Sequence, residues 1–498
     1  MNSEIELKFY TPDDCLAKLH RILDEFSILQ HEVRHLRSVY FDTNDRQLRR
    51  WRMGLRIRSG DEKNVQTLKT AGRTVGGLNE RPEYNQVIDG QRPQLSRFEQ
   101  LDWPADVSLD TLEQALLPIF VTDFERTTWL VDLDNETLIE VALDRGELEA
   151  DERREPIHEL ELELIKGDVG QLFYLAQQLA QLDGLLLAST SKAKRGYALA
   201  DGLPNEQPAR LGFVPLTPQN SLLDAFNHSI EYALAHWQRH QQIFIESSQL
   251  RALFEIKQAA RLMHQILNLY QEVLNFDCPW HSELLWLVRQ FDWLDEATHI
   301  RSLLDEQGKF IRKLSNRRVV RKKLDQRLAL LPDAEQMMQF IGSARYNALI
   351  LNMALWIYQG GTIQPKQPQE LVDFASRTLE QSWQDLRQSE FALASIDLAQ
   401  YTRMAGRLRR NLMVGNCLGA LFDPKARDEF RLLWLDLLGG IEDLRLLEPI
   451  AELARNLSEH EEDVKKVRKW LKRKQASITD AMEFTRTEAL ARDDYWHF

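Results

Sequence analysis

Hydrophobic and polar residues alternate strictly at the start of the chain, within Met1 to Tyr10. The run Glu4 to Lys8 places Ile5 and Leu7 on one face and two glutamates and a lysine on the other. Successive side chains of a β-strand point to opposite faces, so one face of this strand can be buried while the other presents its charges. Two interpretations follow. The segment is either an edge strand with a solvated charged face, or one wall of a metal- and phosphate-binding barrel.

The same alternation recurs along the first 202 residues and predicts further strands at 36–40, 51–58, 64–70, 81–87, 124–132, 137–143 and 158–164. Periodicity of 3.6 residues predicts helices from Pro12 to Phe26 and over 112–120 and 168–182, and residues 71–77 are expected to form a loop. Most of the strands have one charged face, and burying unpaired charges in an open sheet is costly. Closing the sheet with the charges inside removes that cost. We therefore predict an α+β protein that begins with an eight-stranded antiparallel β-barrel.

The predicted barrel lining carries two kinds of charged group. Carboxylates suit hard cations such as Mg2+ or Mn2+, and the candidates are Glu4, Glu6, Glu83, Glu140, Asp144, Glu159 and Glu161. Basic groups suit phosphate oxygens, and the candidates are Lys8, Arg56, Arg58, Lys69, Arg81, Arg126 and Lys192. For any one residue a surface ion pair is an equally good interpretation. The repetition of the pattern over many strands favours the lined barrel.

The second half of the chain has a different pattern. Residues 203–220 contain four prolines and are expected to form a linker. Helical periodicity then continues almost to the end, over 221–242, 251–275, 282–306, 317–330, 335–359, 369–386, 398–412 and 428–438, with another helix near the C-terminus. We therefore expect residues 221–498 to form an all-α helical bundle.

Composition narrows the class of protein further. The 498 residues are 43% hydrophobic and 28% charged, which describes a water-soluble protein of two or three domains. No apolar run approaches the roughly 20 residues needed to cross a bilayer, so no membrane partner is expected. The three cysteines, Cys15, Cys278 and Cys417, are far apart and suit a reducing, cytoplasmic location.

These motifs, taken in order, resemble the CYTH domain of the triphosphate tunnel metalloenzymes, a family that includes bacterial inorganic triphosphatases. Glu4 to Lys8 matches the ExExK signature, Tyr40 to Thr43 followed by Gly54 to Arg58 resembles the next block, and Ser191-Lys192 stands at the expected end. The resemblance covers residues 1–202. It implies a tunnel in which a divalent metal, Mg2+ or Mn2+, supports hydrolysis of inorganic triphosphate to pyrophosphate and phosphate.

The resemblance also implies roles for individual residues. Metal ligands would be Glu4, Glu6, Glu83, Asp144, Glu159 and Glu161, with Glu163 able to replace one of the last two. Substrate would be bound by Lys8, Arg56, Arg58, Lys69, Arg81, Arg126 and Lys192. Catalysis would depend most directly on Glu4, Glu6, Lys8, Arg56 and Arg58.

A helical domain after a CYTH domain resembles the CHAD architecture, which is associated with polyphosphate binding. This chain departs from that pattern, because Lys257 and Ala260 stand where the family has histidine and arginine. Two basic stretches, 309–327 and 465–474, are either solvated helix faces or a cradle for polyphosphate. Few aromatic residues interleave with them, which argues against a nucleic-acid partner.

Several functions remain open at this point. The same fold could serve an adenylate cyclase or a thiamine or nucleoside triphosphatase, because fold resemblance does not fix the substrate. The chain could also be a non-enzymatic polyphosphate-binding protein with an inactive tunnel. The full set of glutamates, arginines and lysines in the predicted lining argues for an enzyme, and inorganic triphosphate is the expected substrate.

Overall fold

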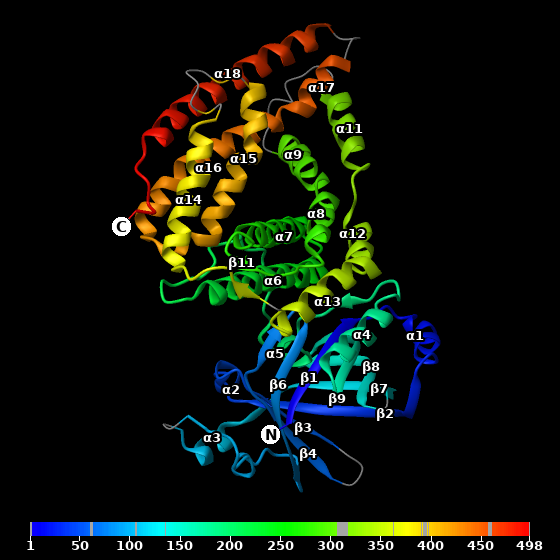
Figure 1. Ribbon diagram of the computed structural model, residues 1–498. Coiled ribbons are helices and arrows are strands. Elements are labelled where there is room, and N and C mark those ends of the chain that lie inside the picture. The colour runs from blue at the N-terminus through cyan, green and yellow to red at the C-terminus, as the bar shows by residue number, and fades with distance from the viewer. Residues whose placement is uncertain are drawn as a thin grey trace. The chain divides into compact units, whose positions relative to one another are not determined.

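The chain folds into two compact units, shown in Figure 1. The computed structural model describes residues 2–59, 63–104, 107–134, 136–305, 317–361, 363–389, 391, 396, 398–456 and 461–497. The first unit comprises Met1–Gln207, Gln241–Ser248 and Glu335–Gln359. The second comprises Pro208–His240, Gln249–Ala334 and Gly360–Phe498. The first unit therefore recruits two segments that lie beyond residue 202, the end of the predicted barrel domain.

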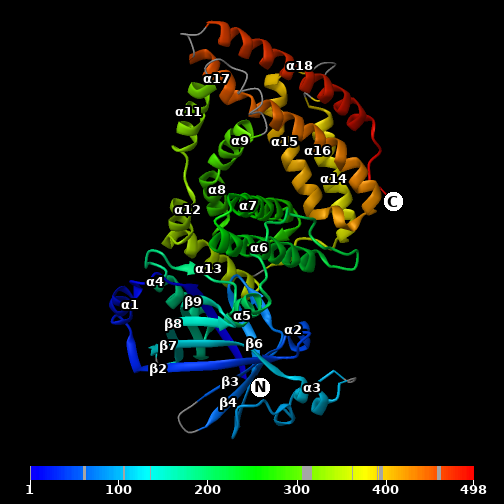
Figure 2. The ribbon, with the colours of Figure 1, turned by 180° about the vertical axis from the view of Figure 1, so that it is seen from behind.

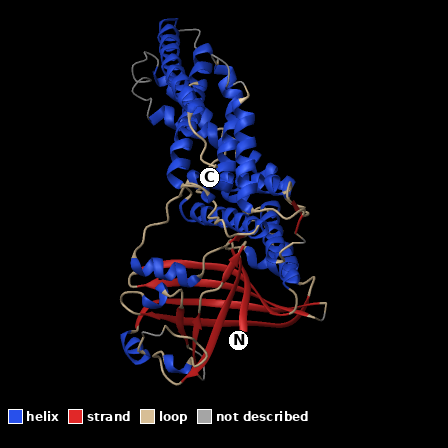
Figure 3. Ribbon diagram, turned by 60° about the vertical axis from the view of Figure 1, so that its left-hand side comes forward, coloured by secondary structure: helices blue, strands red, loops and turns tan. Residues whose placement is uncertain are grey.

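The first unit is built on a closed antiparallel barrel, whose strands are red in Figure 3. Eight of the described strands follow one another around the barrel in the order β1 (Asn2–Tyr10), β9 (Arg153–Lys166), β8 (Thr137–Ala150), β7 (Leu117–Leu133), β2 (Ser27–Asp42), β3 (Gly54–Arg58), β4 (Asn64–Lys69) and β6 (Leu78–Ile88). Two short strands, β5 (Arg73–Val75) and β10 (Leu186–Leu187), add to β6 and β1. The predicted fold class, with its eight-stranded antiparallel barrel, is confirmed.

The opening strand β1 closes the barrel by pairing with two partners. Its first half, Asn2 to Glu6, pairs with β6, and its second half, Glu6 to Tyr10, pairs with β9. The long strands β2 and β7 lie side by side on the opposite part of the wall (Figure 1, Figure 2). Closure leaves no free strand edge in this ring, and it gives the charged face of each strand a shared interior.

The apolar faces of the strands point outward and are covered by helices. Leu7 and Phe9 of β1 are fully buried, and α4 (Val169–Leu179) packs over β9 while α1 (Cys15–Leu23) packs on α4. A separate cluster that includes Leu55 and Leu68 lies under α3 (Leu109–Ala115). These helices supply the hydrophobic core that the charged interior cannot provide.

Helices from far along the chain complete this unit. Asn347 of α13 (Ala344–Tyr358) donates to the carbonyl of Leu185, and Gln241, near the end of α6 (Leu222–Ser247), donates to the carbonyl of Leu187. Asn352 of α13 accepts a hydrogen bond from Gln177 of α4 at 2.8 Å. The short helix α12 (Ala334–Ile341) precedes α13. These contacts attach the far segments to β10 and α4.

The second unit is helical, as predicted. Its main elements are the first part of α6, then α7 (Leu250–Tyr270), α8 (His281–Gln290), α9 (Trp293–Asp305), α11 (Arg317–Leu328), α14 (Leu371–Arg387), α15 (Leu398–Leu418), α16 (Pro424–Leu446), α17 (Glu448–Asn456) and α18 (Glu461–Ala491). A two-stranded sheet joins β11 (Leu274–Asn275) to β12 (Gln364–Pro365). Among the described helices, none combines the length and the apolar composition that a bilayer-spanning segment requires.

The two basic stretches lie partly in described helices. Residues 317–327 belong to α11 and 465–474 to α18, and both helices contribute to one hydrophobic cluster through Val320, Leu324, Val467 and Leu471. The remaining basic residues of the first stretch, Lys309, Arg312 and Lys313, lie outside the described residues.

Some predicted boundaries were wrong. The helix expected over 112–120 ends at Ala115, and β7 begins at Leu117, because Phe120 is needed in the barrel, where its ring stacks on Tyr40 at 4.4 Å. The helix expected from Pro12 begins at Cys15. The helix expected over 335–359 is interrupted at Gly342, where a Cβ would lie only 3.2 Å from the backbone of Gly184. Near Ala115 and Gly342, tertiary packing overrides the local pattern.

Candidate active site

The strand register places all the predicted site residues of the strands on the inner face of the barrel. Directly opposed residues of neighbouring antiparallel strands point to the same side. The opposed pairs include Glu4 with Arg81, Lys69 with Glu83, Lys8 with Glu161, Asp144 with Glu159 and with Arg126, Arg56 with Tyr40, and Arg58 with Ser38. Lys192 reaches the same interior from α5 (Lys192–Asp201). Residues spread over 189 positions of sequence therefore share one enclosed space.

Helix α5 lies against the inner face of the barrel. Ser191 caps it by accepting a hydrogen bond from the amide of Lys194, which fixes the first turn. The ring of Tyr197 meets that of Phe120 edge-on at 5.3 Å, and its hydroxyl donates to buried Asp42 at 2.9 Å. The helix thereby brings the Lys192 ammonium among the carboxylates.

The first group of interior side chains is ion-paired throughout. Lys192 Nζ lies 2.8 Å from Asp144, 2.6 Å from Glu159 and 2.8 Å from Glu161. Arg126 pairs with Asp144 and Glu161, and Lys8 lies 2.8 Å from Glu161. Burial opposes the charged form of Lys192, but the three carboxylates outweigh it and raise its pKa. Likewise the cations hold the pKa of Glu161 well below its usual value despite burial.

The second group has an excess of negative charge. Lys69 pairs with Glu4 and lies 2.9 Å from Glu83, while Glu6 has Lys8 at 3.1 Å. Burial and the neighbouring carboxylate of Glu6 raise the pKa of Glu4. Burial opposes ionisation of Glu83, yet Lys69 and Arg56 lower its pKa to about 2.

Glu163 belongs to this second group. It lies directly opposite Glu6 on one side and Glu140 on the other, so three glutamates face the interior side by side. Burial and the charge of Glu4 raise the pKa of Glu163 to about 7. Close carboxylates of this kind favour binding of either a proton or a metal cation.

The third group consists of arginines that lie close to one another on the inner face. Arg56 and Arg58 are neighbours on the inner face of β3, and Arg58 donates to Ser38 Oγ at 3.2 Å. The charge of Arg56, the burial of the side chain and the charge of Arg126 together lower the pKa of Arg58 to about 9. The buried Nε atom of Arg56 has no hydrogen-bond partner among the described residues. Arg81 lies on the same face, half-buried, and forms no ion pair with any side chain that the structure describes.

Two interior residues were missed at the sequence level. Tyr40 is buried opposite Arg56 and hydrogen-bonds to it, and Arg56 and Lys69 lower the pKa of Tyr40 against the effect of burial. Arg195 pairs with Glu155 and Glu159 from α5. Its position three residues after Lys192 would place both on one helix face, but 189–197 was not predicted to be helical.

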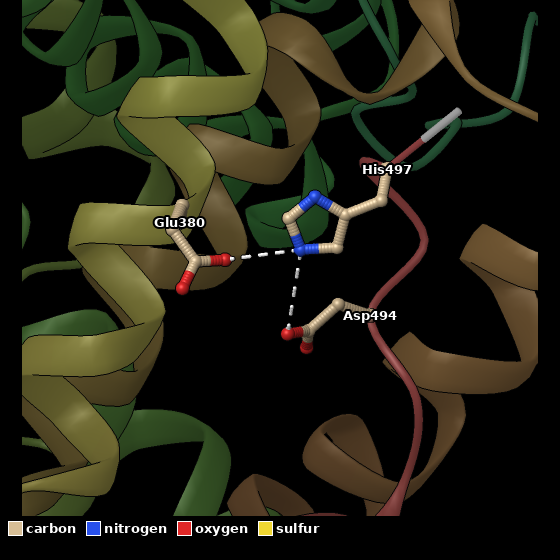
Figure 4. Close-up of side chains that lie close together, drawn as sticks. All are labelled: Glu380, Asp494 and His497. Carbon is tan, nitrogen blue, oxygen red and sulfur yellow. Dashed lines mark ion pairs between the residues drawn. The ribbon is translucent and has the colours of Figure 1, made fainter.

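A further cluster of potential metal ligands lies in the helical unit and is shown in Figure 4. His497 Nε2 lies 3.3 Å from Glu380 and 3.9 Å from Asp494. The carboxylates already have partners, since Trp496 donates to Glu380 at 2.7 Å and Arg387 binds Asp494 through two nitrogens. We interpret this cluster as an attachment of the C-terminal segment to α14.

Comparison with known proteins supports the sequence resemblance. Residues 2–197 match the family model of the CYTH domain, in agreement with the resemblance seen in the sequence. Over 200 residues the chain is 40% identical to an inorganic triphosphatase of Haemophilus influenzae, a match that covers 40% of this chain and 55% of the relative. The chain thus spans about half the length of that curated relative.

Solved structures give weaker likenesses. A Hippeastrum protein, HpAC1, reported to have a dominant triphosphatase activity, is 18% identical with a TM-score of 0.28, over 40% of this chain and 96% of that one. The CHAD domain from the plant Ricinus communis is 19% identical with a TM-score of 0.43, over 58% of this chain and 98% of that one. These TM-scores are too low to establish a shared fold.

Proposed function

We propose that the barrel hydrolyses inorganic triphosphate to pyrophosphate and phosphate with the help of a divalent metal. The observation that carries this proposal is the charge arrangement inside one closed barrel. Two cations, Arg58, which is crowded by other arginines, and Arg81, which has no ion pair among the described side chains, share the interior with glutamates that have too few cations, Glu4 and Glu163. A linear polyanion with a bound cation complements both. The activity named for the Haemophilus influenzae relative supports the same choice.

The interior carboxylates fit Mg2+ or Mn2+, which prefer oxygen ligands. Of the predicted ligands, Glu4 and Glu6 are the best placed, and Glu163 joins them because the three face one another and repel. Glu83 forms an ion pair with Lys69. Asp144, Glu159 and Glu161 are ion-paired with lysines and arginines. Their role in metal binding requires those ion pairs to rearrange. When bound, the metal supplies Lewis-acid polarisation of a phosphoryl oxygen and a more acidic bound water.

The side chains of the chain itself bind and orient the substrate. Arg56 and Arg58 offer guanidinium groups to the phosphate oxygens, and Arg126 adds a third from the adjoining wall. Charge that develops on the departing pyrophosphate is stabilised by these fixed cations. Lys8 and Lys192 lie between carboxylates and reduce the repulsion among them, and their ammonium groups can turn toward substrate.

One assay tests the proposal and separates its alternatives. The full chain is incubated with Mg2+ or Mn2+ and with tripolyphosphate, ATP or thiamine triphosphate, and the products are identified. Release of phosphate and pyrophosphate from tripolyphosphate supports the proposal, and cyclic AMP from ATP would instead indicate a cyclase. Glu4→Gln should abolish the release, whereas Glu147→Gln, which alters an exposed glutamate on the outer face of β8, should not. Unchanged turnover in Glu4→Gln would refute the assignment of Glu4.

A second function, polyphosphate binding, is proposed for the helical unit. It is supported by a group of arginines on three helices, Arg261 of α7, Arg409 of α15 and Arg445 of α16, of which the last two share one carboxylate, Glu442, as their ion-pair partner. Burial and the charges of Arg445 and Arg261 lower the pKa of Arg409 to about 10. Polyphosphate should bind the full chain in a salt-dependent manner. Binding should weaken in Arg409→Met but not in Arg377→Met, which removes an exposed arginine of α14. Equal binding by both variants would contradict this site.

A cytoplasmic location is part of the same proposal. Its support is the state of the cysteines, since Cys15, Cys278 and Cys417 are all unpaired in the structure and suit a reducing compartment.

A further inference from the structure

The two oxygens of the Glu159 carboxylate are bound by two different cations of one helix. Oε2 lies 2.6 Å from Lys192 Nζ, and Oε1 pairs with Arg195 Nη1. Lys192 and Arg195 are three residues apart on α5, so they project from the same side of the helix. Glu159 is almost fully buried, with its side chain 1% exposed, so water cannot replace either partner.

Arg195 is itself fixed in place by several contacts. Its Nε lies 2.6 Å from Glu155, its Nη2 donates to the carbonyl oxygen of Pro156, and its guanidinium lies 5.6 Å from the centre of the Tyr10 ring. Burial acts against the charged form, but Glu159 and the other neighbours raise the pKa of Arg195. The guanidinium is therefore a permanent charge held at one geometry.

Tyr10 is braced in turn by a residue of the helical segments. Gln242 of α6 donates to the Tyr10 hydroxyl at 3.0 Å. Burial raises the pKa of Tyr10 to about 12, so the hydroxyl stays protonated and neutral beside Arg195 and Glu159. The contacts from Gln242 through Tyr10 to Arg195 support the tunnel wall at its α5 end.

We propose that Arg195 is a positioning residue for substrate binding, which rests on the function proposed above. By neutralising one oxygen of Glu159, Arg195 prevents that carboxylate from drawing Lys192 fully to itself. Lys192 then stays shared among Asp144, Glu159 and Glu161, with its ammonium available to a phosphate group in the tunnel. Without Arg195, Glu159 would be a buried carboxylate with half its charge uncompensated, and its pull on Lys192 would increase.

The test measures binding of tripolyphosphate to the full chain by calorimetry in EDTA, so that no metal or turnover is required. Arg195→Met should raise Kd by about tenfold, a magnitude typical of removing a residue that orients a ligating group. Arg195→Lys should recover most of the affinity, because it restores a cation to Glu159. Arg154→Met, which removes an exposed arginine of β9 from the outside of the barrel, should bind as the wild type does.

A second pair of variants separates positioning from general structural damage. In Glu159→Gln the carboxylate that pulls on Lys192 is gone, so adding Arg195→Met should cause no further loss of affinity. This pair leaves no buried unpaired carboxylate at position 159, so it remains informative even if Arg195→Met alone fails to fold. A further loss in the double variant, or unchanged binding in Arg195→Met, would overturn the inference.

Failure of the proposed hydrolysis can be distinguished from failure of the role inferred for Arg195. If the wild type binds tripolyphosphate but does not hydrolyse it with Mg2+ or Mn2+, the proposed activity fails while the role of Arg195 is still decided by the binding data. If the wild type does not bind tripolyphosphate in EDTA yet hydrolyses it with Mg2+ or Mn2+, the inference about Arg195 is overturned while the proposed activity stands. Where hydrolysis is observed, Arg195→Met should raise KM more than it lowers kcat, because the residue acts through the binding position of Lys192.

Discussion

Arg126 and Asp144 face each other across β7 and β8 and form a two-pronged ion pair, with Nε 2.6 Å from Oδ1 and Nη2 2.7 Å from Oδ2. Asp144 is fully buried, and Lys192 lies 2.8 Å from its Oδ2. Both carboxylate oxygens are therefore bound by cations of the chain. This arrangement gives Asp144 a structural part in holding the arginine and lysine of the tunnel, beside any part in metal binding.

The first prediction concerns that ion pair. Asp144→Asn removes a buried negative charge and leaves Arg126 and Lys192 short of a partner, which should lower the free energy of unfolding of the barrel by roughly 3 kcal/mol. Hydrogen exchange of the barrel strands in urea and EDTA measures this directly. Asp134→Asn, in the turn after β7, provides the matched control. Equal protection in the two variants would show that the buried pair contributes nothing.

The second prediction concerns pH and Glu163, whose pKa is about 7 in the fold against 4.5 for a free glutamate. Between these values the folded chain keeps a proton that the unfolded chain has lost, so stability falls as pH rises from about 4.5 to about 7 and levels off above that. The total loss is on the order of 3 kcal/mol. Glu163→Gln should flatten this part of the stability curve in EDTA, and an unchanged slope would count against the assignment.

The third prediction concerns Arg58, which is crowded by Arg56 and Arg126. Arg58→Met should raise the melting temperature of the ligand-free chain, because it removes like-charge repulsion at the cost of one hydrogen bond to Ser38. The same change should weaken tripolyphosphate binding by about tenfold or more, as expected for loss of a charge-assisted contact. Scanning calorimetry measures the melting temperature, and calorimetric titration measures the binding of tripolyphosphate. A variant that is less stable and binds normally would contradict the proposed role.

The fourth prediction concerns Lys69, which neutralises Glu4 and Glu83. Lys69→Met should lower the melting temperature in EDTA, since the facing glutamates then lack their cation. Addition of Mg2+ or Mn2+ should restore more stability to this variant than to the wild type, because the metal replaces the missing charge. Lys166→Met, at the exposed end of β9, should show no such difference. If metal stabilises both variants equally, Lys69 does not neutralise the glutamates proposed to bind the metal.

Much of the barrel was predictable from the chain alone, for a simple physical reason. A strand has a period of two, so the alternation in Glu4 to Lys8 and in 158–164 assigns each residue to a face without knowledge of its neighbours. When so many strands carry a charged face, a closed barrel with a polar interior lets these charges face one another instead of being buried unpaired. Helical periodicity defined the second half equally directly, although individual boundaries near Ala115 and Gly342 depended on packing.

What the tertiary structure alone decided is which charges meet. The sequence treats Glu4, Asp144 and Glu159 as equivalent carboxylates, yet the fold surrounds the last two with cations and leaves Glu4 and Glu163 repelling each other. Coulomb energies depend on distances between strands that are far apart in sequence, and no local pattern contains them. The opening strand illustrates both the part determined by sequence and the part determined by tertiary structure. Its own residues determined that glutamates and a lysine would share a face, and only the closed barrel determined that Lys8 would stand between Glu6 and Glu161.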